Sequence, residues 1–122
     1  MTFAEIIEQL PAILIYKGSD YSDFVVRHVV AGDLMSDVLV TEYDDLVMIS
    51  SLNSEQIMRT ANMVGARGIL LVNGKIPSSL MKNIAEEDDI TLLSTSLPMY
   101  EASIALGHLL GPSDPISKGA LK

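Results

Sequence analysis

Four short polar loops in this sequence hold the side chains best suited to binding a small anionic molecule. Each follows an apolar run that is typical of a strand, and three lead quickly into an expected helix, whose free N–H groups favour phosphate or carboxylate. Parallel strands would bring the loops to one edge of the sheet, where open α/β sheets bind ligands. The candidate ligand-binding residues in these loops are Asp33, Asn53, Asn73, Gly74, Ser94, Thr95 and Ser96.

The same loops also have a structural explanation. Residues that commonly cap helices, each stabilising its helix by about 1 kcal/mol, occur in three of them: Asp33, Asn53 and one of Ser94, Thr95 and Ser96. Asn73-Gly74 suits a tight turn and lacks the frame of a phosphate-binding loop, so Lys75 is expected to be solvated. At this point both explanations stay open.

Complete catalytic or metal-binding arrangements are not recognisable in the sequence. The chain has no cysteine, which excludes thiolate catalysis and Cys-ligated metals. His28 and His108 lie apart from any serine and aspartate pattern of a catalytic triad, and Asp33 and Asp37 have no third ligand within sequence reach. We therefore expect a protein that is not an enzyme and has no cofactor and no metal.

Composition and charge restrict the possible partners. The chain of 122 residues has a formal net charge of −8, and its eight basic residues are scattered. Nucleic acids and anionic membrane surfaces both require a clustered basic surface, so neither partner is expected. No apolar run reaches the roughly 18 residues of a membrane span, and the first residues do not resemble a secretion signal. We expect a cytoplasmic protein.

Strands and helices are expected to alternate along most of the chain. This alternation predicts a single three-layer α/β domain over 1–110, with a largely parallel central sheet flanked by helices, and a flexible tail over 111–122. Consecutive strands should lie side by side in the same direction. The acidic run 86–89 is expected to form a solvated loop, with a weak partner-facing surface as the alternative. Strands are expected at 12–16, 24–31, 45–50, 67–72 and 90–94, and helices at about 2–10, 33–40, 53–65, 77–88 and 98–110.

The expected helix 33–40 is unusually apolar for its length. Its surplus of apolar side chains either lies beneath another helix or faces a second subunit. We take Leu34, Met35 and Val38 as candidate interface residues.

Two segments, VVAGDLMSDVLV and GARGILLVNGKIPSSLMKNIAEEDDITLLSTSLPMYEAS, resemble the DRTGG domain. That module is similar to the N-terminal domain of HPr kinase/phosphorylase and also occurs in phosphotransacetylases and CBS-domain proteins. Gly32 and Asp33 match the start of its name-giving motif, but residues 34–36 stand where Arg-Thr-Gly would be. Tyr100 and Glu101 match its C-terminal motif, and the resemblance makes Tyr100 a further candidate ligand-binding residue.

The resemblance implies a fold like that of the HPr kinase N-terminal domain and a regulatory or dimer-forming role. We therefore expect a stand-alone, non-enzymatic regulatory or adaptor domain that homodimerises and acts on a partner enzyme, ATPase or CBS protein. The alternative is a sensor that binds a phosphorylated metabolite or nucleotide at the carboxyl ends of the strands. The net negative charge and the missing arginine count against this alternative, because phosphate normally requires a cationic clamp.

Overall fold

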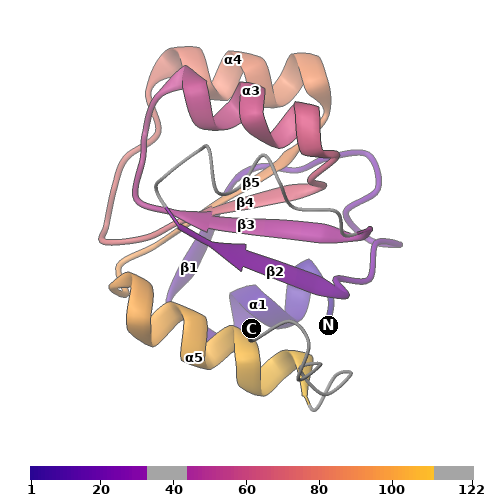
Figure 1. The fold of residues 1–122 in the computed structure, drawn as a ribbon, viewed down its shortest axis with the longest axis vertical. Coiled ribbons are helices and arrows are strands. Elements are labelled where there is room, and N and C mark those ends of the chain that lie inside the picture. Colours follow the sequence, from indigo (N-terminus) through magenta and orange to yellow (C-terminus); the bar gives the residue numbers. More distant parts are fainter. Residues whose placement is uncertain (33–43, 112–122) are drawn as a thin grey trace, which may run out of the picture.

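The computed structural model describes residues 1–32 and 44–111, which form a sheet covered by helices on both faces (Figure 1). Helices α3 and α4 lie on one face, and α1 and α5 lie on the other. The strands are β1 (Ala12–Tyr16), β2 (His28–Ala31), β3 (Leu46–Ser50), β4 (Gly68–Leu71) and β5 (Thr91–Thr95). The helices are α1 (Phe3–Gln9), α3 (Glu55–Val64), α4 (Ser79–Asp88) and α5 (Met99–Leu110).

The central strands are buried on both faces, which explains their nearly continuous apolar sequences. Along β3, Leu46 and Met48 belong to the core beneath α3 and α4, whereas Val47 and Ile49 belong to the core beneath α1 and α5. Side chains of a strand alternate between its two faces, so this run supplies both cores at once. The three-layer α/β architecture predicted from the sequence is therefore confirmed.

Strand order follows the prediction in the second half of the chain and departs from it at β1. The order across the sheet is β1-β5-β4-β3-β2, and the pairs β2–β3, β3–β4 and β4–β5 are parallel. Strand β1 instead pairs antiparallel with β5, at the edge opposite β2. The expectation that all consecutive strands lie side by side in one direction is thus wrong for β1. Because β1 is antiparallel, its amino end lies at the same rim as the carboxyl ends of the other strands.

The start of the chain packs under the sheet through a close contact between Phe3 and Gly68. The Phe3 ring stacks on Tyr21 and Phe24, with ring centroids 5.6 and 5.4 Å apart. A Cβ atom at Gly68 would lie 2.5 Å from the Phe3 ring, so β4 requires glycine at this position. The expected strand 24–31 is shortened to β2 because the N–H group of Val26 donates to the carbonyl of Met1 instead of joining the sheet.

Helix ends agree with the sequence signals in part. The Thr2–Glu5 capping box is present at α1. Helix α3 begins after Ser54, not Asn53, and α5 begins after Pro98, so the expected caps at Asn53 and at residues 94–96 are wrong. Two of the latter, Ser94 and Thr95, belong to β5 itself.

Several sequence expectations fall outside the described residues. These are the helix 33–40 with Asp33, Leu34, Met35 and Val38, and nearly all of the tail 111–122. Within 1–32 and 44–111, no helix combines the length and the apolar character needed to cross a bilayer.

Candidate functional site

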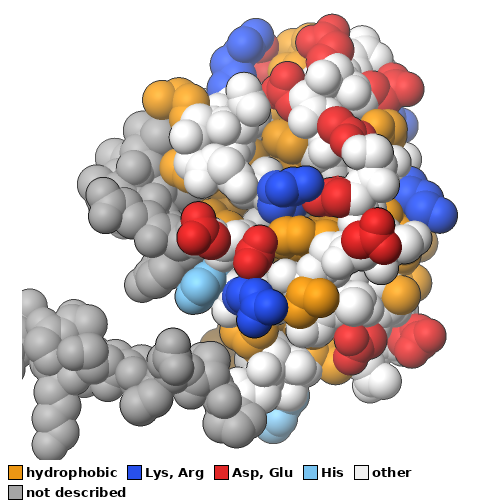
Figure 2. All heavy atoms as spheres, turned by 90° about the vertical axis from the view of Figure 1, so that its right-hand side faces the viewer, with side chains coloured by type: hydrophobic (Ala, Val, Ile, Leu, Met, Phe, Trp, Pro, Cys, Tyr) orange, Lys and Arg blue, Asp and Glu red, His pale blue; other side chains and the backbone are white. Residues whose placement is uncertain are grey.

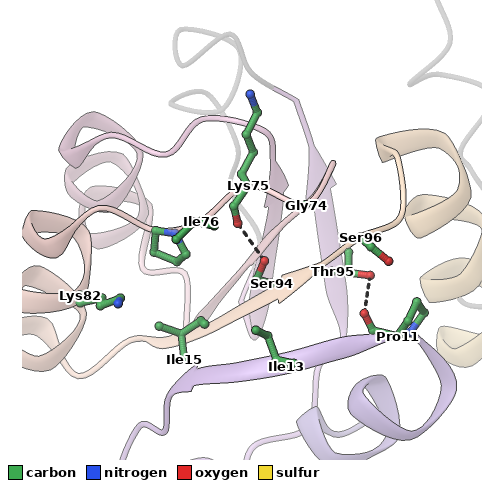
Figure 3. Close-up of a pocket in the computed structure, with 11 residues that line it drawn as sticks. Pro11, Ile13, Ile15, Gly74, Lys75, Ile76, Lys82, Ser94, Thr95 and Ser96 are labelled. Carbon is green, nitrogen blue, oxygen red and sulfur yellow. Dashed lines mark hydrogen bonds between the residues drawn. The ribbon is translucent and has the colours of Figure 1, made fainter.

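A cavity of about 300 Å³ opens where the carboxyl ends of β4 and β5 meet the amino end of β1 (Figure 3). The start of β1, the end of β5, the loop between β4 and α4, and the first turn of α4 form its wall. Its position at the strand ends is where ligands bind in open α/β sheets. The lining residues are Pro11, Ile13, Ile15, Gly74, Lys75, Ile76, Pro77, Lys82, Ser94, Thr95 and Ser96.

The loop between β4 and α4 is held in place by its own backbone. Asn73 and Gly74 have φ angles of 61° and 67°, which produces the tight turn that the sequence predicts. The N–H of Asn73 donates to the carbonyl of Leu97 at 2.8 Å, and that of Gly74 donates to the carbonyl of Thr95 at 3.0 Å. The N–H of Lys75 donates to the carbonyl of Val72 at 3.3 Å. All three N–H groups of the turn are therefore occupied within the protein.

Two hydroxyl groups of β5 also hold the cavity together. The Ser94 hydroxyl donates to the carbonyl of Lys75 at 2.9 Å, and the Thr95 hydroxyl donates to the carbonyl of Pro11 at 3.1 Å (Figure 3). A hydroxyl has one hydrogen to donate. Ser94 and Thr95 therefore have no hydroxyl hydrogen left for a ligand, and the Thr95 oxygen also accepts the N–H of Leu97 at 3.3 Å. Both residues anchor the walls on either side of β5.

The cations of the described residues divide into paired and unpaired groups, and the unpaired ones are at this cavity. The three arginines form ion pairs with carboxylates: Arg27 with Asp45, Arg59 with Glu55, and Arg67 with Asp20. The ammonium group of Lys17 lies 5.1 Å from the centre of the Tyr21 ring.

Lys75 and Lys82 both line the cavity, and neither has a carboxylate partner among residues 1–32 and 44–111. The Lys82 side chain extends toward Ile15, whereas the Lys75 side chain points away from the other labelled residues (Figure 3). Lys75 is exposed, as the sequence predicted.

The rest of the wall is apolar. Ile13 and Ile76 both line the opening, with 63% and 77% of their surface exposed, and Ile15 is partly buried. Pro11 and Pro77 complete this surface. The cavity thus combines aliphatic walls with ammonium groups near its rim, an arrangement suited to a molecule that has an apolar body and a negative charge.

The structure brings some of the predicted binding residues together and separates others. Gly74, Ser94, Thr95 and Ser96 line the cavity. Asn53 and Asn73 do not line the cavity; the Asn53 amide donates to the carbonyl of Ile76 at 3.3 Å and supports the loop. Tyr100, with 73% of its surface exposed on α5, does not line the cavity, and Asp33 lies outside the described residues.

Sequence reasoning missed the contributions of β1 and α4. Pro11, Ile13 and Ile15 reach the site because β1 is antiparallel, and Lys82 reaches it from inside a helix. The alternation of strands and helices does not reveal either placement. An available signal was the short connection at Pro11, since β1 begins at Ala12, two residues after the C-cap of α1 at Leu10.

A second polar cluster lies around Asp89, at the end of α4. Asp89 adopts a φ of 55°, and its carboxylate accepts hydrogen bonds from the Ser19 hydroxyl, the Ser19 N–H at 2.9 Å and the Tyr16 hydroxyl at 2.9 Å. These bonds, first among them the one from the Ser19 hydroxyl, lower the pKa of Asp89. The bond to Asp89 raises the pKa of Tyr16. The expected solvated loop is therefore wrong for Asp89, which ties the end of β1 to the end of α4.

The opposite end of the sheet carries mixed charges. Figure 2 shows acidic and basic side chains next to one another there, with the basic groups separated from each other. The ring nitrogen Nδ1 of His28 lies 2.7 Å from the carbonyl of Asp44. In the described part of the chain, no group of three or more His, Asp or Glu side chains could hold a metal ion.

Comparison with solved structures identifies a protein of similar fold. No protein-family model and no curated protein matches the sequence. The structure is similar to that of the CBS and DRTGG domains of the regulatory region of a Clostridium perfringens pyrophosphatase, solved in complex with its activator, diadenosine tetraphosphate. The two share 17% sequence identity and superpose with a TM-score of 0.73 over 86% of this chain and 45% of the other.

The chain thus spans less than half of that regulatory-region chain. At this level of identity the likeness concerns the fold, and it agrees with the resemblance carried by the sequence segments around Gly32 and Tyr100. The domain has a DRTGG-like α/β fold, and its structural neighbour is a regulatory region, not a catalytic one.

Proposed function

We propose that this chain is a non-enzymatic regulatory domain that senses a small anionic metabolite in the cavity between β1, β5 and the loop before α4. The observation that carries the proposal is the placement of Lys75 and Lys82. The chain has a net charge of −8. Among the lysines and arginines of the described residues, Lys75 and Lys82 have no acidic or aromatic partner, and both line the same cavity. A regulatory role is supported by the DRTGG-like fold.

The two lysines supply what the sequence motif lacks. An arginine is missing from the segment that resembles the name-giving motif, which argued against phosphate binding. Lys82 extends its side chain toward the cavity wall at Ile15, and Lys75 adds a second positive charge at the rim. An ammonium–phosphate hydrogen bond is about twice as strong as a neutral one, so a bond from Lys82 together with the charge of Lys75 helps to offset the general repulsion of an anion by this acidic chain.

The activator bound by the structural neighbour is a phosphate-rich nucleotide. This supports the idea that a phosphorylated metabolite or nucleotide is the regulatory signal of the present chain as well. The partner on which the domain acts would be an enzyme, an ATPase or a CBS protein in the cytoplasm.

Isothermal titration calorimetry tests the proposal with glycerol 3-phosphate, glucose 6-phosphate and AMP as probes. We expect at least one of them to bind, and we expect Lys82→Gln to weaken binding about tenfold or more, since a hydrogen bond to a charged group contributes about 1.5–3 kcal/mol. Lys17→Gln is the matched control, because it removes the same charge outside the cavity lining and should leave affinity within about twofold. Equal losses in the two variants, or no binding of either these probes or simple alkyl phosphates, would contradict the proposal.

A second candidate function, a homodimeric adaptor, is favoured by the character of β1. This strand lies at the edge of the sheet, carries no charged residue, and exposes 63% of Ile13 and 37% of Leu14. Edge strands are normally protected by charges, prolines or bulges. Strand β1 follows Pro11 and has an irregular register between Leu14 and Tyr16, but it has no charge to oppose pairing of its regular part, Ala12–Leu14, with another strand. Antiparallel pairing of two copies of β1 would make a two-fold symmetric dimer.

A further inference from the structure

We infer that the cavity selects an amphipathic anion, with a single negatively charged group on a compact aliphatic or aromatic body, in preference to a sugar phosphate or a polyphosphate. The inference rests on the proposed function and specifies the chemistry of the ligand at that same site. Three properties of the cavity lead to it: its donor groups, its walls and its size.

Donor groups are scarce in this cavity. Binding several phosphates normally requires a run of free backbone N–H groups or a cluster of cations. The N–H groups of Asn73, Gly74 and Lys75 all donate to carbonyls of the protein, and the hydroxyl hydrogens of Ser94 and Thr95 do the same.

The residues of the cavity lining with a free side-chain donor are Lys75, Lys82 and Ser96. Of these, Lys82 extends toward the apolar wall at Ile15, whereas Lys75 points away and Ser96 lies at the opposite end of the lining (Figure 3). One ammonium group directed at the wall suits a ligand with one phosphate or one carboxylate. A chain of phosphates, or a sugar with several hydroxyl groups, would leave polar atoms without partners against the cavity wall, which is unfavourable.

The walls are apolar and partly exposed. Large aliphatic side chains such as Ile13 and Ile76 bury little of their surface within the domain, although both border a cavity. Covering them with the apolar part of a ligand would remove that surface from water, at a gain of about 25 cal/mol per Å². Together with Ile15, these side chains form the surface on which the body of the ligand would lie.

The size of the cavity sets an upper limit. About 300 Å³ lies at the lower end of the range for small-molecule pockets. A compact body with one charged group fits this volume, whereas an extended dinucleotide with a polyphosphate chain does not fit inside it. The ligand inferred here therefore differs in kind from the activator of the structural neighbour.

A matched pair of phosphate esters tests this inference. Propyl phosphate and glycerol 3-phosphate share a three-carbon skeleton and the same charged group, but the second carries two hydroxyl groups. We expect propyl phosphate to bind at least tenfold more tightly in calorimetric titrations of the full chain. Along the series methyl, propyl and butyl phosphate, affinity should rise by up to about fourfold for each added CH₂ group. Pentanoate, compared with butyl phosphate, shows whether the site prefers carboxylate or phosphate.

Substitution of the wall provides the control. Ile13→Ser should flatten the dependence of affinity on chain length while leaving methyl phosphate binding within about twofold. Ile104→Ser, a change of another exposed isoleucine, on α5 and outside the cavity lining, should leave the series unchanged.

The outcomes separate this inference from the proposed function. Binding that weakens in Lys82→Gln but does not depend on chain length, or tighter binding of glycerol 3-phosphate than of propyl phosphate, would overturn the inference and leave the proposed function in place. If neither the esters nor the metabolite probes bind, both proposals fail.

Discussion

The side-chain hydroxyl of Ser94 donates a 2.9 Å hydrogen bond to the backbone carbonyl of Lys75, and this bond joins the end of β5 to the loop that enters α4. The Ser94 hydroxyl gives its hydrogen to the protein and not to a ligand. Ser94 therefore shapes the cavity by holding the neighbouring loop in place. Ser94 is buried, and its bond fixes the loop residues that carry one ammonium group and one exposed isoleucine of the cavity.

Ser94→Ala should therefore loosen the cavity wall. We expect the free energy of unfolding to fall by about 0.5–1.5 kcal/mol, because one intramolecular hydrogen bond is lost. Affinity for propyl phosphate should fall at the same time, since Lys75 and Ile76 are no longer held in place. Urea denaturation and calorimetric titration measure the two effects. Ser96→Ala, at an exposed position, should leave the denaturation midpoint unchanged.

The contact between Phe3 and Gly68 predicts a clear stability effect. In Gly68→Ala the new Cβ atom would lie 2.5 Å from the Phe3 ring, and the overpacking should lower the free energy of unfolding by about 1–3 kcal/mol. The double variant Phe3→Leu with Gly68→Ala should recover part of this loss.

Gly107→Ala is the matched glycine change, because nothing lies within 4 Å of a Cβ atom placed there in α5. It should raise the free energy of unfolding by about 0.5–1 kcal/mol, since alanine favours the helix. If both glycine variants shift stability in the same direction, the described contact is wrong.

The cluster around Asp89 predicts how stability depends on pH. Hydrogen bonds from Ser19 and Tyr16 lower the pKa of Asp89 in the folded protein. The unfolded chain therefore binds more protons in mild acid, and the stability that Asp89 contributes is present above about pH 4 and is lost as pH falls through the lower pKa of the folded state.

Asp89→Asn keeps a residue that tolerates positive φ but removes the charge. Its Tm should be below that of the unmodified protein at pH 7, and the two values should converge as the pH is lowered from 5 to 2. Thermal scans by circular dichroism measure both values, and Asp88→Asn, at an exposed neighbouring position, controls for net charge. A Tm difference that does not change with pH would contradict the role assigned to Asp89.

The adaptor proposal predicts a dimer with a locatable interface. Light scattering after size-exclusion chromatography should report twice the mass of one chain. If β1 pairs with β1 of a second copy, Leu14→Lys should shift the protein to the monomer mass. If the interface instead lies on the segment with Leu34 and Met35, Leu34→Glu should have that effect and Leu14→Lys should not. A monomer mass for the unmodified protein at micromolar concentration would remove the proposal.

Much of the fold could be predicted because its signals are local. The apolar runs of β3 and β4, the capping box at Thr2 and Glu5, and the turn at Asn73-Gly74 each depend on neighbouring residues, and the structure confirms all of them. The parallel arrangement of β3, β4 and β5 followed from the same alternation, since helical connections between adjacent strands favour it. Consequently Gly74 and Ser94, which follow from the same local signals, lie at the edge of the sheet where the cavity opens.

The remaining features depended on packing between distant segments. No local pattern shows that β1 crosses to the far edge and runs antiparallel, and this placement delivers Pro11, Ile13 and Ile15 to the cavity. In the sequence, nothing distinguishes Lys82 from the other polar residues of α4. It reaches the cavity because that helix packs beside β1. The strands, the helices and the edge where polar loops gather follow from short-range periodicity and capping, so they can be predicted from the sequence. Which charges and apolar side chains share the cavity depends on the order and direction of strands that are far apart in the chain, so it is seen only in the folded structure.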